Sequence, residues 1–208
     1  SDDCGKVRFW DITSNTGEEL FHRSVNASGG HVPLTLSRDG SWLAVSDNHS
    51  VSIWDANTGF DLLVLPFGWY INGADFSPDG KLFAAGGYGT TIKIWDLSMP
   101  TEKLTITAHD GNRIGDVAFN PNGTQLATES LDDGKAKLWD VNTGKNILTI
   151  NDSDICCATA FSPNGFQLVF GSITGVAKIR DAQTSKILVE LSEHTDSVAR
   201  VIYSPDGS

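Results

Sequence analysis

The stretch Phe76-Ser77-Pro78-Asp79-Gly80 and the tripeptide Ile94-Trp95-Asp96 that follows it decide the fold, because the chain repeats both. The dipeptide Trp-Asp stands at 10–11, 54–55, 95–96 and 139–140, and a decayed copy, Arg180-Asp181, continues the series. Successive copies are 44, 41, 44 and 41 residues apart. A constant period of this length indicates an array of similar structural units.

The turn sequence gives the same period independently. Its other copies are Leu36-Ser37-Arg38-Asp39-Gly40, Phe119-Asn120-Pro121-Asn122-Gly123, Phe161-Ser162-Pro163-Asn164-Gly165 and Tyr203-Ser204-Pro205-Asp206-Gly207. The apolar segments between the turns are short and rich in β-branched and aromatic residues, which is typical of strands joined by Asp-Gly or Asn-Gly hairpins. In the repeat that begins at His109, we expect four antiparallel strands at 114–119, 125–130, 135–139 and 146–150.

With these motifs the chain resembles the WD-repeat (WD40) family over essentially its full length. The resemblance implies an all-β fold, a β-propeller of four-stranded antiparallel blades, of which the chain is an incomplete arc of about five WD repeats. We expect one propeller segment over residues 1–208, a fragment of a longer WD-repeat protein whose edges need covering. Its expected parts are a partial blade at 1–27, full blades at about 28–66, 67–108, 109–151 and 152–192, and a partial blade at 193–208 that opens with a first strand at 198–203.

Composition narrows the classes of function. The 15 basic and 26 acidic residues give a net charge of −11, which repels phosphate backbones and makes direct nucleic-acid binding unlikely. The apolar runs are much shorter than the roughly 18 residues of a membrane helix, so we expect no membrane span. Of the three cysteines, Cys156 and Cys157 are neighbours, and neighbours rarely pair. We therefore expect no disulfide scaffold and a reducing, cytoplasmic location.

The family resemblance also implies a buried polar group within a blade. It joins a His before the first strand, a Ser or Thr on the second, an Asp in the following turn and the Trp of Trp-Asp, because buried polar groups need partners. One repeat carries the whole set, namely His109, Ser130 (or Thr128), Asp133 (or Asp132) and Trp139. The catalytic-triad interpretation of the same residues is disfavoured, because no nucleophile elbow accompanies them.

Other repeats depart from this set. Phe67 replaces the His in the repeat at 67–108. In the repeat at 152–192, Asp152 replaces the His and Arg180 replaces the Trp. The histidines and cysteines lack zinc-site spacing, so we expect neither a metal nor another cofactor. Asp75 and Asp116 fall in expected inner strands. We favour the interpretation that they line a water-filled central channel over the interpretation that they form a ligand site. With Asp154 they are the only candidates for an enzyme that uses the central channel.

The expected partner site lies on one rim of the propeller. Loops before first strands and turns between second and third strands emerge on the same rim, and they bring aromatic, His and Arg side chains together. Aromatic and Arg residues dominate interface hot spots. The candidates are Trp69, Tyr70, Tyr88, His31, His49 and Arg113, with Phe67 and Trp69 alternatively filling the space of the missing His.

These patterns favour a non-catalytic module that binds a protein or peptide, as the sensor or scaffold part of a larger signalling protein. The remainder of its own propeller and other subunits of a complex are the expected partners. A propeller enzyme and a structural subunit of a large assembly are the alternatives, because fold alone does not dictate function.

Overall fold

The structure is a computed structural model that describes residues 6–10, 19–24, 33–47 and 49–207. Four antiparallel four-stranded sheets succeed one another along the chain, each with its strands in sequence order. They comprise β3 (Leu34–Leu36), β4 (Trp42–Ser46), β5 (Ser50–Asp55) and β6 (Asp61–Pro66); β7 (Ile71–Phe76), β8 (Leu82–Gly87), β9 (Thr91–Asp96) and β10 (Thr101–Thr107); β11 (Ile114–Phe119), β12 (Gln125–Ser130), β13 (Lys135–Asp140) and β14 (Asn146–Asn151); and β15 (Ile155–Phe161), β16 (Gln167–Ser172), β17 (Ala177–Asp181) and β18 (Ile187–Leu191). We call these sheets blades 1 to 4.

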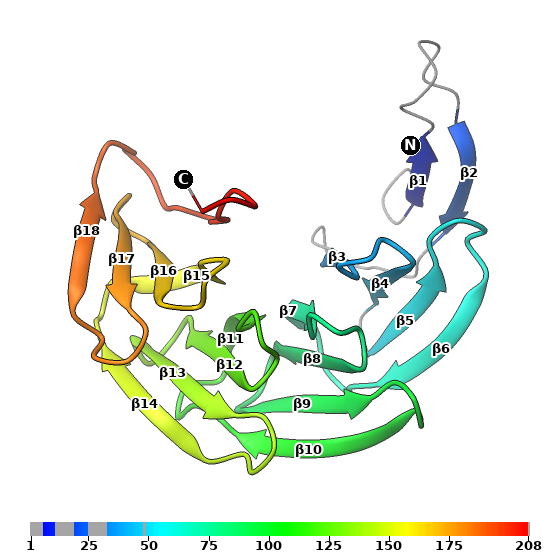
Figure 1. Ribbon diagram of the computed structural model, residues 1–208, viewed down its shortest axis with the longest axis horizontal. Coiled ribbons are helices and arrows are strands. Elements are labelled where there is room, and N and C mark those ends of the chain that lie inside the picture. Colours follow the sequence, from blue (N-terminus) through cyan, green and yellow to red (C-terminus); the bar gives the residue numbers. More distant parts are fainter. Residues whose placement is uncertain (1–5, 11–18, 25–32, 48, 208) are drawn as a thin grey trace.

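The blades are arranged as an open arc (Figure 1). Strands β7, β11 and β15 lie on its inner side, and β10, β14 and β18 on its outer side. A pair of strands, β1 (Lys6–Trp10) and β2 (Glu19–Ser24), precedes blade 1. The predicted all-β fold, an incomplete propeller of four-stranded antiparallel blades, is therefore confirmed. Each four-stranded sheet lies within one expected blade, whereas the exact unit boundaries stay a prediction.

The repeated motifs form the hairpins. In the turn after β7, the Ser77 hydroxyl donates to Asp79 (2.7 Å) and accepts from the Leu82 amide (2.8 Å). The glycine that ends this motif has a positive φ of 70 to 76° in all five copies, which explains why Gly stands there. In the Trp-Asp motif, Asp140 Oδ1 accepts from the Asn142 and Thr143 amides (3.1 and 2.7 Å), and so closes the turn between β13 and β14.

Apolar side chains fill the spaces between neighbouring blades. One core cluster contains Phe67, Phe83 and Trp95 together with Val51 and Leu65 of blade 1. A second joins blade 2 to blade 3, and a third joins blade 3 to blade 4. The inner strands approach closely, because a Cβ added to Gly73 on β7 would lie 2.5 Å from the Asp116 Cα atom on β11. This packing holds each blade against the next and gives the inner strands fixed positions.

Two sequence expectations are wrong. Residues 198–203 form no strand. Val198 is buried against blade 4, and its amide donates to the Ser172 carbonyl oxygen. The first strand of a blade pairs with the second strand of the same blade, and the sequence contains no such strand after residue 203. Cys156 and Cys157 are joined by a disulfide, although neighbouring cysteines were expected not to pair. A left-handed conformation at Cys157 (φ 76°) accompanies this bond.

Candidate functional site

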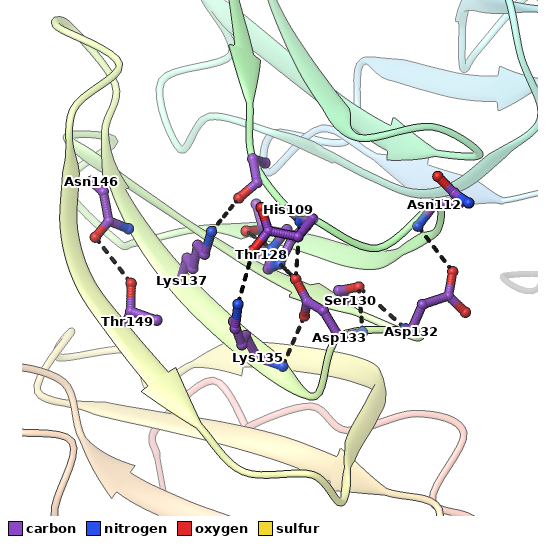
Figure 2. A network of polar contacts seen from close by, with 12 residues as sticks. His109, Asn112, Thr128, Ser130, Asp132, Asp133, Lys135, Lys137, Asn146 and Thr149 are labelled. Atoms are coloured by element: carbon purple, nitrogen blue, oxygen red, sulfur yellow. Dashed lines mark hydrogen bonds and ion pairs between the residues drawn. The ribbon is translucent and has the colours of Figure 1, made fainter.

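The first candidate site is a buried chain of hydrogen bonds inside blade 3 (Figure 2). Trp139 Nε1 donates to Thr128 Oγ1 (2.9 Å), which lies 2.9 Å from His109 Nε2. His109 Nδ1 lies 3.1 Å from Asp133 Oδ2. We call His109, Thr128, Asp133 and Trp139 the tetrad.

Donor and acceptor roles follow from the chemistry of the partners. A carboxylate oxygen accepts hydrogen bonds, so His109 Nδ1 carries the hydrogen and donates it in the bond to Asp133 Oδ2. Nε2 of a neutral ring then accepts from the Thr128 hydroxyl. Burial lowers the pKa of His109, and the Asp133 charge opposes that shift only in part. The ring is therefore neutral near pH 7, and every group in the chain of bonds is satisfied.

The hydroxyl of the tetrad belongs to Thr128, so the choice of Ser130 was wrong. Residues 128 and 130 point to the same face of β12, and only the geometry separates them. Ser130 Oγ instead accepts weakly from the Asp132 and Asp133 amides (3.2 and 3.3 Å) and supports the turn. Asp133, rather than Asp132, is the carboxylate that reaches the ring.

Blade 4 fills the equivalent space with charges. Asp152 Oδ2 lies 2.8 Å from Lys178 Nζ and 2.5 Å from Arg180 Nη2, and all three side chains are mostly buried. Burial raises the pKa of Asp152, but the contacts with Lys178, the Asp154 amide and Arg180 more than offset it and hold it below its usual value. We call Asp152, Lys178 and Arg180 the ion cluster. In blade 2 the same space is apolar, with Phe67 packed on Trp95 at 6.3 Å between ring centroids.

The acidic residues of the inner strands link blades. Asp75 Oδ2 on β7 accepts from the Phe119 amide (2.8 Å) on β11, and Asp116 Oδ2 accepts from the Thr159 amide (3.0 Å) on β15. Burial raises their pKa values, to about 7 for Asp75 and about 6 for Asp116. Asp154 lies elsewhere, 3.7 Å from Lys178, so the three acids do not converge on one site. Among the described residues no cluster of three or more His, Cys, Asp or Glu side chains could hold a metal ion.

The second candidate site is a row of exposed side chains that crosses three blades. The His49 and Tyr70 ring centroids lie 6.3 Å apart, and the Tyr70 and Tyr88 centroids lie 5.7 Å apart in an edge-on arrangement. Tyr88 pairs with Arg113 of blade 3 through a β-bridge. Both tyrosines are nearly half exposed, at 44% and 46%. We call His49, Tyr70, Tyr88 and Arg113 the rim row.

The backbone beneath the rim row is held at several points. The Tyr88 amide donates to the Tyr70 carbonyl (2.8 Å), and the Gly89 amide donates to the Asn112 carbonyl (2.6 Å) of the next blade. Arg113 Nη2 donates to Asp132 Oδ1 (2.6 Å) and fixes the guanidinium at one end of the row. The row is thus preorganised, which reduces the entropy lost when a partner binds.

The remaining predicted site residues divide into three cases. Trp69 is 65% exposed, so it does not fill the space of the missing His, whereas Phe67 is buried there. His31 lies outside the described residues.

Sequence reasoning missed Asp132 as the partner of Arg113, and it missed the ion cluster. The sequence contained a signal for the cluster. Lys178 and Arg180 lie two residues apart on β17 and therefore share one face of the strand. Arg180 replaces the Trp and Asp152 replaces the His, so this face is the one that meets Asp152.

Radially stacked four-stranded blades with these turns and a His–Thr–Trp–Asp group define a WD-type propeller. The sequence profile described as "WD domain, G-beta repeat" matches residues 24–55, 65–96 and 100–140. The chain therefore belongs to the WD40 repeat family, whose members generally act as protein-interaction scaffolds.

Individual relatives agree with this assignment. The chain is 25% identical over 96% of its length to the target of rapamycin complex subunit wat1 of Schizosaccharomyces pombe, and covers 65% of that protein. It is 29% identical over 90% of its length to a guanine nucleotide-binding protein subunit beta of Solanum tuberosum (53% covered), and 30% identical over 64% to a serine-threonine kinase receptor-associated protein of Dictyostelium discoideum (43% covered). The chain thus spans about half of the length of the curated relatives that it matches. In its described part, no helix could cross a membrane.

Proposed function

We propose that the rim row, with Trp69 beside it, docks a protein or peptide partner, and that the chain is the scaffold or sensor part of a larger signalling protein in the cytoplasm. The observation that carries the proposal is the unbroken sequence of ring contacts from His49 through Tyr70 to Tyr88, ending on a fixed Arg113. Aromatic and Arg side chains on a rigid surface are the usual anchors of protein interfaces. The similarity to wat1, a target of rapamycin complex subunit, agrees with such a role.

The proposal is tested by measuring partner binding to the full-length protein. Proteins captured by the wild type are compared with those captured by Tyr70→Ala and Tyr88→Ala variants, and the affinity of each purified partner is then measured. Phe60→Ala is the matched control, because Phe60 is an exposed aromatic residue (71%) outside the rim row. Partners that both tyrosine variants lose and the control retains would support the proposal, whereas unchanged affinity in both tyrosine variants would refute it.

A further inference from the structure

The innermost strand of blade 4 contains a larger bulge than its counterparts in blades 2 and 3. β15 (Ile155–Phe161) has 7 residues, whereas β7 and β11 each have 6 between the same Ile and Phe positions. Between the pairs Ile155–Ser172 and Thr159–Phe170, three residues of β15 stand opposite Gly171 alone. In β11 the equivalent bulge contains a single extra residue, Gly115. The additional residue of blade 4 therefore falls at Cys156-Cys157-Ala158.

The bulge makes an unusual disulfide geometrically accessible. Neighbouring residues of a regular strand point to opposite faces of the sheet, so their sulfur atoms cannot meet. Here Cys157 adopts a left-handed φ of 76°, which is unfavourable for a non-glycine residue, and the two sulfur atoms are bonded. Cys156 is buried, at 3% exposure, whereas Cys157 is only partly buried. An external reagent would therefore reach Cys157 first.

A buried acid faces the same bulge. Glu129 on β12 is fully buried, and neither carboxyl oxygen has a hydrogen-bond partner of good geometry. It fits beside β11 only because Gly115 has no side chain, since a Cβ there would collide with Glu129 Oε1. Burial raises the pKa of Glu129 to about 8, with a contribution from Asp116 on β11; the Cys157 amide on β15 lowers it and Asp133 raises it slightly. A buried acid without well-placed partners is rare, so the surroundings of this bulge differ from ordinary packing.

We propose that Cys156 and Cys157 form a redox-active pair that exchanges with low-molecular-weight disulfides and thiols. In oxidation, the Cys157 thiolate attacks one sulfur of the small disulfide, forms a mixed disulfide and expels one thiolate. The Cys156 thiolate then attacks Cys157 Sγ, forms the Cys156–Cys157 bond and expels the second thiolate. Two electrons pass from the cysteines to the small disulfide, and the two cysteine protons end on the two expelled thiols. Reduction by small thiols reverses both steps.

Mass spectrometry of the full-length protein tests this proposal. The protein is equilibrated in buffers of varied reduced and oxidised glutathione, quenched with acid and alkylated, and the tryptic peptide 146–178 is analysed, because it contains both cysteines and not Cys4. We expect the doubly alkylated peptide to give way to the internally bonded peptide as the oxidised share rises. A peptide that stays doubly alkylated in every buffer, or accumulates glutathione without an internal bond, would overturn the proposal.

Single substitutions test the assignment of roles. In Cys156→Ser, glutathione should accumulate on Cys157, because the second attack is removed. In Cys157→Ser, the buried Cys156 should remain unmodified, and its glutathionylation would contradict the proposed order. As an independent probe, phenylarsine oxide bridges two neighbouring thiols, so it should bind the reduced wild type and neither variant. Failure of the wild type to bind it would also overturn the proposal, and none of these results depends on the rim row.

Discussion

Blade 3 and blade 4 solve the same packing problem with different chemistry. In the tetrad the His109 ring is neutral near pH 7 and each polar group has a partner, whereas the ion cluster confines three charges in the same part of the blade. The cluster is also less completely satisfied, because the buried Arg180 Nε has no hydrogen-bond partner. Blade 2 omits polar groups and uses Phe67 against Trp95. The four-stranded blade therefore does not depend on the tetrad, and these groups adjust stability within a fold that apolar packing specifies.

The largest effect is expected from Asp152→Ala in the ion cluster. The substitution leaves Lys178 and Arg180 buried without their counter-charge, and the loss of one partner of a buried ion pair costs about 3–5 kcal/mol. Denaturant unfolding of the full-length protein measures the loss. Asp154→Ala is the control, because Asp154 is more exposed and lies farther from Lys178 Nζ (3.7 Å) than Asp152 does (2.8 Å). Its loss should cost less than about 1 kcal/mol. Equal losses for the two variants would contradict the description of the cluster.

A smaller loss is expected from His109→Ala in the tetrad. It removes a partner from Asp133 and from Thr128 and should cost about 1–3 kcal/mol at pH 7.5. Because the folded pKa of His109 is lowered, the unfolded state binds more protons in acid, so the contribution of His109 falls as pH drops below about 6.5. The difference between wild type and variant should therefore shrink by pH 5. His22→Ala, at an exposed position, should cost about 0.5 kcal/mol or less, and a loss equal to that of His109→Ala would contradict the tetrad assignment.

Glu129→Gln tests the opposite sign of pH dependence. The folded pKa of Glu129 is raised to about 8 from a usual value of 4.5, so stability declines as pH rises through this interval and the lost part does not return above it. The uncharged Gln removes the decline. We expect the variant to be more stable than wild type by a few kcal/mol at pH 9 and similar to it at pH 5, because each unit of pKa shift corresponds to about 1.4 kcal/mol. Parallel stability curves for the two proteins from pH 5 to pH 9 would show that Glu129 is solvated.

The contrast between the blades also shows what the sequence can predict. The period, the turns and the strands of blade 3 follow from local signals, and 114–119 and 125–130 match β11 and β12. Thr128 and Ser130 share one strand face, so only side-chain geometry could show which of them contacts His109. The disulfide depends on the bulge of β15. The only trace of this bulge in the sequence is one additional residue between Ile155 and Phe161, compared with Ile114 to Phe119 in β11. The expected strand at 198–203 needed a pairing partner that local sequence cannot supply.

We expect the tetrad to serve stability and the rim row to serve recognition. One paired measurement tests it directly: the melting temperature and the affinity for a captured partner, determined for Tyr88→Ala and His109→Ala in the full-length protein. Tyr88→Ala should weaken binding by roughly 1 kcal/mol or more, about fivefold, with nearly unchanged melting temperature. His109→Ala should lower the melting temperature by several degrees and leave the affinity of the folded protein unchanged. Unchanged binding in Tyr88→Ala, or lost binding in a folded His109→Ala variant, would contradict the claim.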